Sequence, residues 1–171
     1  ASNGVDFGDL SRNKISNTSC ASPTRGIMGS GHSQGDRTNI IDYISISTQG
    51  NSADFGDATG HGKGGFGCSN AVRGVFGGGS NPADCNVINF LTIATLGDTK
   101  DFGDLSTLTS PNGGGCASST RGLVLGRHVS NSYKNTIEFV QIMTTGNAID
   151  FGDLTVTRQR IAASSNGHGG L

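Results

Sequence analysis

The chain is short of charge, tryptophan and long apolar runs, and these shortages exclude several classes of protein. Lysine and arginine number 12 against 13 acidic residues, so no basic surplus can neutralise phosphates and nucleic-acid binding is not expected. No apolar run approaches the ~18 residues of a membrane-spanning helix, so no membrane insertion is expected. The low charge also argues against a disordered chain. A soluble β protein rich in glycine, serine, threonine and asparagine remains.

An initiator methionine and a leader peptide are also missing from the start of the sequence. Residues 1–5 read Ala-Ser-Asn-Gly-Val, with neither a basic nor an apolar region. We therefore expect these residues to begin a segment of a longer chain.

Glycine is abundant, at 29 of 171 residues, and it punctuates a tandem repeat. The tetrapeptide Asp-Phe-Gly-Asp occurs at Asp6–Asp9, Asp54–Asp57, Asp101–Asp104 and Asp150–Asp153, at intervals of 47 to 49 residues. Self-similarity at a fixed period of this length is typical of repeat architectures.

Two further signatures keep the same period. An apolar segment recurs at 40–46, 87–93 and 136–142. A cysteine followed five residues later by Arg-Gly also recurs, and in the fourth copy Ser164 or Ala163 stands at the cysteine position. The cysteines and arginines concerned are Cys20 and Arg25, Cys68 and Arg73, and Cys116 and Arg121.

Each period predicts three to four short strands and no helix. The apolar segments are rich in isoleucine, valine, threonine and aromatic residues, and Gly-Asn or Gly-Asp steps after them suit tight turns. The period has the size of one propeller blade. We predict an all-β fold of β-propeller blades, or part of a propeller, in preference to a β-prism or β-trefoil-like pseudo-threefold arrangement. One domain, 1–171, would contain units 6–53, 54–100 and 101–149 and a partial unit 150–171.

Segments 41–47 (Ile-Asp-Tyr-Ile-Ser-Ile-Ser), 73–79, 145–154 and 165–171 give the chain a family resemblance that extends over essentially its whole length. It resembles the kelch-like, glycine-rich repeats of virion proteins in tailed bacteriophages, especially tail-fibre and tail-associated proteins of marine and cyanobacterial phages. The resemblance implies folding in the host cytoplasm, a virion location, contacts with other virion proteins and a homo-oligomer. Kelch units carry a tryptophan, which this chain lacks, so a propeller is implied only by size and pattern.

The Asp-Phe-Gly-Asp residues and the arginines are predicted to form the framework of each unit. The phenylalanines would plug the core between units, and the aspartates would cap turns or pair with the arginine. A calcium site is the weaker alternative because the carboxylates are sparse, so no metal is expected. For the arginines, an ion pair or carbonyl clamp within the repeat is preferred over a ligand-facing row. The framework residues are Asp6, Phe7, Asp9, Asp54, Phe55, Asp57, Asp101, Phe102, Asp104, Asp150, Phe151, Asp153, Arg25, Arg73 and Arg121.

No constellation of catalytic residues is recognisable, so neither an enzyme nor a cofactor is expected. Asp-Phe-Gly occurs in protein kinases, but the accompanying kinase motifs are missing and four copies do not fit one active site. Three of the four cysteines occupy equivalent repeat positions, which favours free thiols in packed sites over disulfides.

Three segments, 30–38, 80–86 and 127–134, differ in length and chemistry between the units. Binding residues concentrate on loops held by a rigid scaffold, so ligand-facing residues are predicted here, namely His32, Asn81, His128 and Tyr133. The predicted function is a structural and adhesive component of a phage virion whose loops recognise a host-surface glycan. The alternatives are a free-standing carbohydrate-binding lectin-like module and an extracellular filament protein whose open ends pair with the next chain.

Overall fold

The structure, a computed structural model, describes residues 3–60, 62–80, 83–109, 113–129, 132–158 and 160–165. These residues form strands and no helix, which confirms the all-β prediction. The strands are β1 (Ser19–Ala21), β2 (Arg25–Met28), β3 (Gly31–Ser33), β4 (Asp36–Thr38), β5 (Ile40–Ser45), β6 (Ala53–Asp57), β7 (Phe66–Ser69), β8 (Arg73–Gly77), β9 (Cys85–Thr92), β10 (Lys100–Thr109), β11 (Gly114–Ala117), β12 (Arg121–Val129), β13 (Ser132–Gln141) and β14 (Ile149–Arg158).

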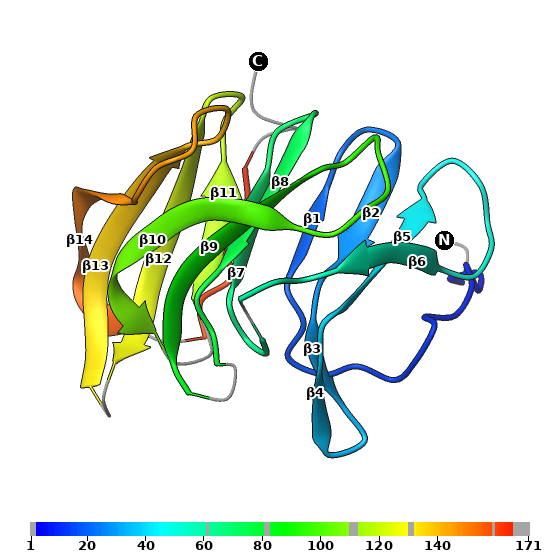
Figure 1. Cartoon of the computed structure of the whole chain (residues 1–171), viewed down its shortest axis with the longest axis horizontal. Coiled ribbons are helices and arrows are strands. Elements are labelled where there is room, and N and C mark those ends of the chain that lie inside the picture. The colour runs from blue at the N-terminus through cyan, green and yellow to red at the C-terminus, as the bar shows by residue number, and fades with distance from the viewer. Residues whose placement is uncertain are drawn as a thin grey trace.

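The strands form three four-stranded antiparallel sheets and a separate hairpin, β3–β4. The first sheet has the order β1-β2-β5-β6, the second β7-β8-β9-β10 and the third β11-β12-β13-β14. Figure 1 shows the three sheets side by side, from the first at the right to the third at the left. Among the described residues no sheet closes on itself.

Each repeat signature has a fixed place in these sheets. The cysteine lies in the first strand, Arg-Gly opens the second strand, the apolar segment forms the third, and Asp-Phe-Gly-Asp lies in the fourth. Each sheet therefore ends with the motif, whereas the units drawn from the sequence begin with it. The copy at Asp6–Asp9 belongs to no strand.

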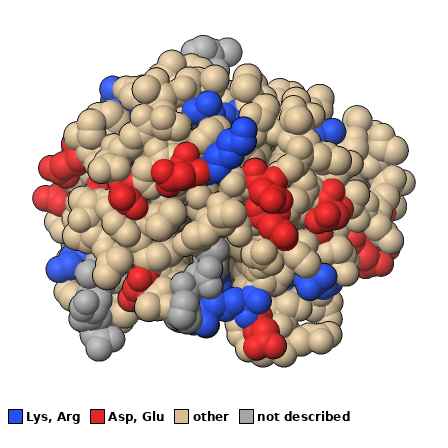
Figure 2. Space-filling model, viewed as in Figure 1, with Lys and Arg blue, Asp and Glu red and all other residues tan. Residues whose placement is uncertain are grey.

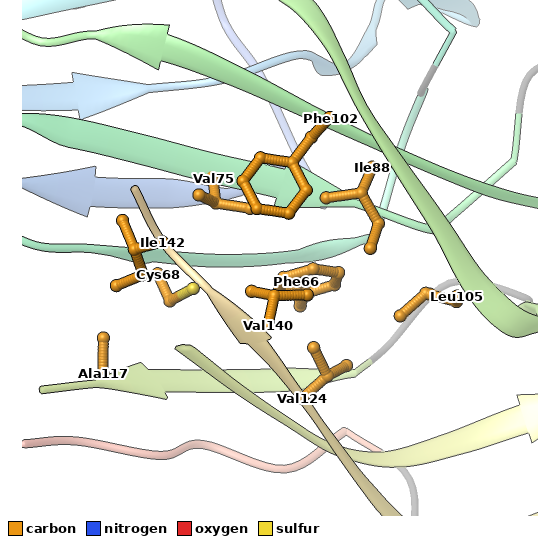
Figure 3. Close-up of a cluster of buried hydrophobic side chains, with 10 residues drawn as sticks. All are labelled: Phe66, Cys68, Val75, Ile88, Phe102, Leu105, Ala117, Val124, Val140 and Ile142. Carbon is orange, nitrogen blue, oxygen red and sulfur yellow. The ribbon is translucent and has the colours of Figure 1, made fainter. Parts of the chain in front are cut away.

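The hydrophobic core lies between sheets. One cluster joins the first sheet to the second through Ile27, Ile41, Phe55, Phe76 and Leu91. The other joins the second sheet to the third, and its labelled side chains converge in Figure 3. Its members are Phe66, Cys68, Val75, Ile88, Phe102 and Leu105 from the second sheet and Ala117, Val124, Val140 and Ile142 from the third.

Neighbouring sheets share a recurring contact that we call the joint. In a joint, the Asp-Phe-Gly-Asp segment of one sheet lies on the turn after the third strand of the next sheet. Gly97 donates its N–H to the carbonyl of Phe55 at 2.8 Å, and Thr99 donates to that of Asp57 at 2.9 Å. The equivalent bonds of the next joint are Gly146 to Phe102 (2.7 Å) and Ala148 to Asp104 (2.8 Å).

The glycine of the motif is required by this close approach. Gly56 has φ +145°, and a Cβ added there would lie 2.5 Å from the carbonyl oxygen of Gly97. Gly103 has φ +146° and faces Gly146 at the same 2.5 Å. Only glycine combines this backbone conformation with so short a distance to a neighbouring backbone.

The prediction that all four phenylalanines plug the core is wrong for two of them. Phe55 and Phe102 are each 2% exposed, whereas Phe7 is 37% and Phe151 49% exposed. Phe55 and Phe102 are buried because the following sheet covers each of these rings. Phe151 lies in the third sheet, which no later sheet of the described residues covers, and Phe7 lies on a segment without a sheet of its own.

The expected pairing of arginine with the second aspartate is also wrong. Arg25 donates through Nη1 to the carbonyl of Ile93 at 2.8 Å, and Arg73 donates to that of Ile142 at 3.0 Å. Each guanidinium also lies over an aromatic ring of its own sheet, Arg25 over Tyr43 and Arg73 over Phe90, while its Nη1 reaches a carbonyl of the next sheet. The arginine therefore binds a carbonyl, as one of the predicted alternatives had it, but the carbonyl belongs to the next sheet and not to the same repeat.

Turn capping by the first aspartate is seen at the two end copies of the motif. The Oδ1 of Asp6 accepts the N–H of Gly8 at 3.1 Å, and the Oδ1 of Asp150 accepts that of Gly152 at 3.3 Å. The second aspartate contributes through its backbone instead, since the N–H of Asp57 donates to the Oδ1 of Asp98 in the next turn at 2.9 Å.

Candidate functional site: the variable edge

The three variable segments connect the second strand to the third strand of each sheet, so they lie at one edge of the molecule. In the first sheet the connection is the β3–β4 hairpin, in the second it is 78–84, and in the third it is the far end of β12 and β13, at 127–134. Figure 1 shows all three along the lower edge. We call these segments the variable edge.

The β3–β4 hairpin is the most prominent connection. Gln34 and Gly35 have φ of +49° and +95°, as a two-residue hairpin turn requires at its centre. The hairpin is attached to the N-terminal segment, since His32 exchanges two 2.9 Å backbone hydrogen bonds with Ile15. His32 is itself half-buried, whereas Asp36 and Arg37 beside the turn are exposed.

The connection of the third sheet carries two of the predicted residues together. His128 pairs with Tyr133 across the strands, and their ring centroids are 5.4 Å apart. Tyr133 is 49% exposed, so its ring is open to a ligand. Arg127 belongs to the framework instead, because it is buried and pairs with Glu138 at 2.8 Å.

A hollow of about 490 Å³ adjoins Tyr133. Arg158 and Arg160, both exposed, lie on its wall, together with Thr157, Ile161 and Ala162. Among the described residues, no carboxylate lines the hollow. A guanidinium can bind a carboxylate with two parallel hydrogen bonds, and the tyrosine offers an apolar face with a polar tip. This arrangement suits an acidic sugar.

The two arginines were not among the residues predicted from the sequence. They follow the fourth Asp-Phe-Gly-Asp copy, and nothing in the period marks them as partners of Tyr133, which lies 25 and 27 positions earlier. Only the pairing of β13 with β14, which sets Lys134 opposite Arg158, brings them beside Tyr133. The only feature of the sequence that could have drawn attention to them is their positive charge, which they share with the other cationic residues among the 12 of the chain.

The middle connection is compact in its described part, 78–80 and 83–84. Cys85 donates its N–H to the carbonyl of Gly79 at 3.0 Å, and Ser80 donates to that of Lys63 at 3.2 Å. Asn81, predicted to face a ligand, lies outside the described residues. Figure 2 shows acidic side chains in a broken row across the middle of this face, whereas both signs of charge occur towards the lower edge.

A second hollow, of about 370 Å³, contains the row of cysteines. It is lined by the first strands β1, β7 and β11, with residues 163–165 beside them. All four cysteines lie in described residues and none forms a disulfide. Burial and, to a smaller extent, the neighbouring Cys116 together raise the pKa of the Cys68 thiol to about 12, so this thiol stays protonated at neutral pH.

The cysteine row is a packing feature. A Cβ added at Gly74 would lie 2.6 Å from the Sγ of Cys20, and one added at Gly122 would lie 2.7 Å from the Sγ of Cys68. The thiols of Cys20 and Cys68 thus fill the space above the Arg-Gly glycine of the next sheet. Within the described residues no group of three or more histidine, cysteine or acidic side chains could hold a metal ion.

Comparison of the chain with protein-family models and with curated proteins found no match. No helix of the described residues is long and apolar enough to cross a membrane.

Proposed function

We propose that the protein is a structural and adhesive component of a phage virion, a tail-fibre or tail-associated protein, whose variable edge binds a host-surface glycan. The observation that carries the proposal is the hollow beside Tyr133, where an exposed ring meets two exposed arginines at the edge that differs most between repeats. The resemblance of the repeats to phage virion proteins supports the virion location.

The scaffold suits this role because the sheets are fixed to one another. We propose that they are successive blades of a propeller-like array, since they share one strand order and are joined by the same backbone bonds. Such a scaffold presents its connections at regular intervals, so that contacts that are individually weak add through multivalency.

The proposed ligand is an acidic polysaccharide. Two guanidinium groups with no carboxylate among the described residues of the hollow favour an anion, and the half-exposed ring gives a sugar an apolar surface. Because the contacts are exposed and charged, affinity should fall as salt rises.

Binding of the chain to a uronic-acid-rich bacterial capsular polysaccharide, with neutral dextran as the comparison, tests the ligand. Tyr133→Ala and the double variant Arg158→Ala/Arg160→Ala should each weaken binding at least about tenfold. Arg12→Ala removes an exposed cation away from the hollow and should bind like the wild type. Equal binding by all four proteins would contradict the site.

Immunogold electron microscopy of purified particles tests the location. Gold on tail fibres or tail tips would support the adhesive role. Gold on the capsid or tail shaft would leave a structural role without adhesion, and label confined to free filaments or cell surfaces would overturn the virion assignment.

A further inference from the structure

The outer face of the third sheet is the same face that is buried on the other two sheets. Phe151 is 49% exposed where Phe102 is 2%, and a Cβ added at Gly152 would have no atom within 4 Å, whereas one at Gly103 would meet the next turn. Ile149 beside them is 58% exposed. We call this surface the donor face, because it offers an Asp-Phe-Gly-Asp segment.

Arg121 marks the same lack of a neighbour. Its guanidinium lies 4.8 Å from the ring of Phe139, as Arg73 lies over Phe90, but it has no carbonyl acceptor among the described residues. Cys116 is likewise half-exposed, whereas Cys68 is buried against the next sheet. Residues 161–165 lie against the first strand β11. The rest of the donor face retains the groups of a joint without the sheet that would complete it.

The first sheet has the complementary surface, which we call the acceptor face. Ile46 is 44% exposed, whereas its equivalents in the second and third sheets, Ile93 and Ile142, are 1% and 0% exposed beneath the preceding sheet. Met28 and Ile44 of the same sheet are half-buried. The carbonyl of Ile46 is the equivalent of those that accept Arg25 and Arg73 in the two complete contacts.

The turn of the acceptor face is held by the N-terminal copy of the motif. Gly50 donates its N–H to the carbonyl of Phe7 and Ser52 donates to that of Asp9, both at 2.8 Å, and Asp9 donates to the Oδ1 of Asn51 at 2.9 Å. These are the bonds of a joint made by a segment with no sheet behind it, and Phe7 stays 37% exposed. The segment covers the turn but not the apolar surface around Ile46.

We propose that the donor face of one copy of this chain docks on the acceptor face of a second copy, with Asp150–Asp153 replacing Asp6–Asp9 on the turn of the second copy. The geometry of the contact is already present twice within the chain, between the first and second sheets and between the second and third. Arg121 then donates to the carbonyl of Ile46 of the second copy. Because the two faces differ, the contact is heterologous and leaves one face of each kind open for further copies.

Sedimentation velocity over a concentration series of the full chain tests this assembly. The wild type should form a series of oligomers, and Phe151→Asp and Ile46→Asp should each weaken association at least about tenfold by placing a charge in the contact. Val72→Asp alters an equally exposed residue of the second sheet, in the β7–β8 turn, and should associate like the wild type.

A mixture of the two defective variants separates a heterologous contact from a symmetric one. Phe151→Asp keeps its acceptor face and Ile46→Asp keeps its donor face, so an equimolar mixture should form a 1:1 dimer that grows no further. No dimer in the mixture, or association of Phe151→Asp equal to that of the wild type, would overturn the proposal.

Gly8→Ala tests the exchange of segments. A Cβ at Gly8 would lie closer to the Gly50 carbonyl than any real contact allows, so the N-terminal motif should leave the turn and association should strengthen. A wild type and a Gly8→Ala variant that both stay monomeric at all concentrations would also overturn the proposal. These readouts need no glycan, so they fail or succeed independently of the adhesive role.

Discussion

Phe102 and Phe151 occupy the same position in neighbouring sheets and have opposite surroundings. Each ring packs edge-on against an aromatic ring of its own sheet at a centroid distance of 6.0 Å, Phe102 on Phe90 and Phe151 on Phe139. Yet Phe102 is 2% and Phe151 49% exposed. The difference comes from the neighbouring sheet alone. The burial of this ring is therefore a contact between units, as expected for stacked repeats.

The largest expected effect comes from removing the covered ring. Phe102→Ala should lower the free energy of unfolding by about 3–5 kcal/mol, because it leaves a cavity between the second and third sheets. Phe151→Ala, at monomer concentrations, should cost less than about 1 kcal/mol, because its ring is half in water. Urea unfolding of both variants measures the contrast. Equal losses would show that the phenylalanine acts within its own sheet.

The glycines of the same motif should separate the backbone conformation from the joint. Gly103→Ala and Gly152→Ala both place a side chain at a φ that glycine favours, +146° and +137°, which costs about 1–3 kcal/mol in each. Only Gly103→Ala also drives a methyl group into the backbone at Gly146. Its midpoint of urea unfolding should therefore be the lower of the two, and coincident midpoints would remove the steric role of the joint.

The two arginines give a smaller contrast. Arg73→Ala loses the 3.0 Å hydrogen bond to the Ile142 carbonyl and the stacking on Phe90, and should destabilise by about 1–2 kcal/mol. Arg121→Ala should change stability by less than about 0.5 kcal/mol, since this side chain is exposed and its guanidinium stacks on two rings of its own sheet, Phe139 and Phe151. A larger loss for Arg121→Ala in thermal unfolding would contradict the assignment of the clamp to the contact between sheets.

The sequence predicted the elements of the fold better than their contacts. The apolar segments at 40–46, 87–93 and 136–142 are strands β5, β9 and β13, because β-branched and aromatic composition acts locally. The placement of the sheets in space determines which sheet covers Phe102. It also brings Arg73 to the carbonyl of Ile142, which is 69 residues away in the sequence. The repeat period of a sequence shows that the units are alike, but it does not show at which residue of the period a sheet begins.

The candidate site was predictable only in part for the same reason. Variation between repeats identified the loops, and with them Tyr133 and His128. It could not identify Arg158 and Arg160, which lie in and after a framework strand and reach the hollow through the pairing of β13 with β14. The repeat period does not show which residues become neighbours when two strands pair.

The thiols extend the comparison to a pH dependence. Burial raises the pKa of Cys68 from 9.0 to about 12, so above pH 9 the unfolded chain releases this proton while the folded chain keeps it. The contribution of Cys68 to stability is therefore complete below about pH 9 and is lost as the pH rises towards 12. Cys116 is half-exposed and its pKa is raised by partial burial without a sheet to cover it, so the same loss should be smaller. Replacing Cys68 with alanine should flatten the fall of the unfolding free energy between pH 8 and 10.5 more than replacing Cys116 does.

At pH 9, iodoacetamide should accordingly modify Cys116 first, and peptide mapping that finds Cys68 alkylated at the same rate would show that the second and third sheets do not enclose it.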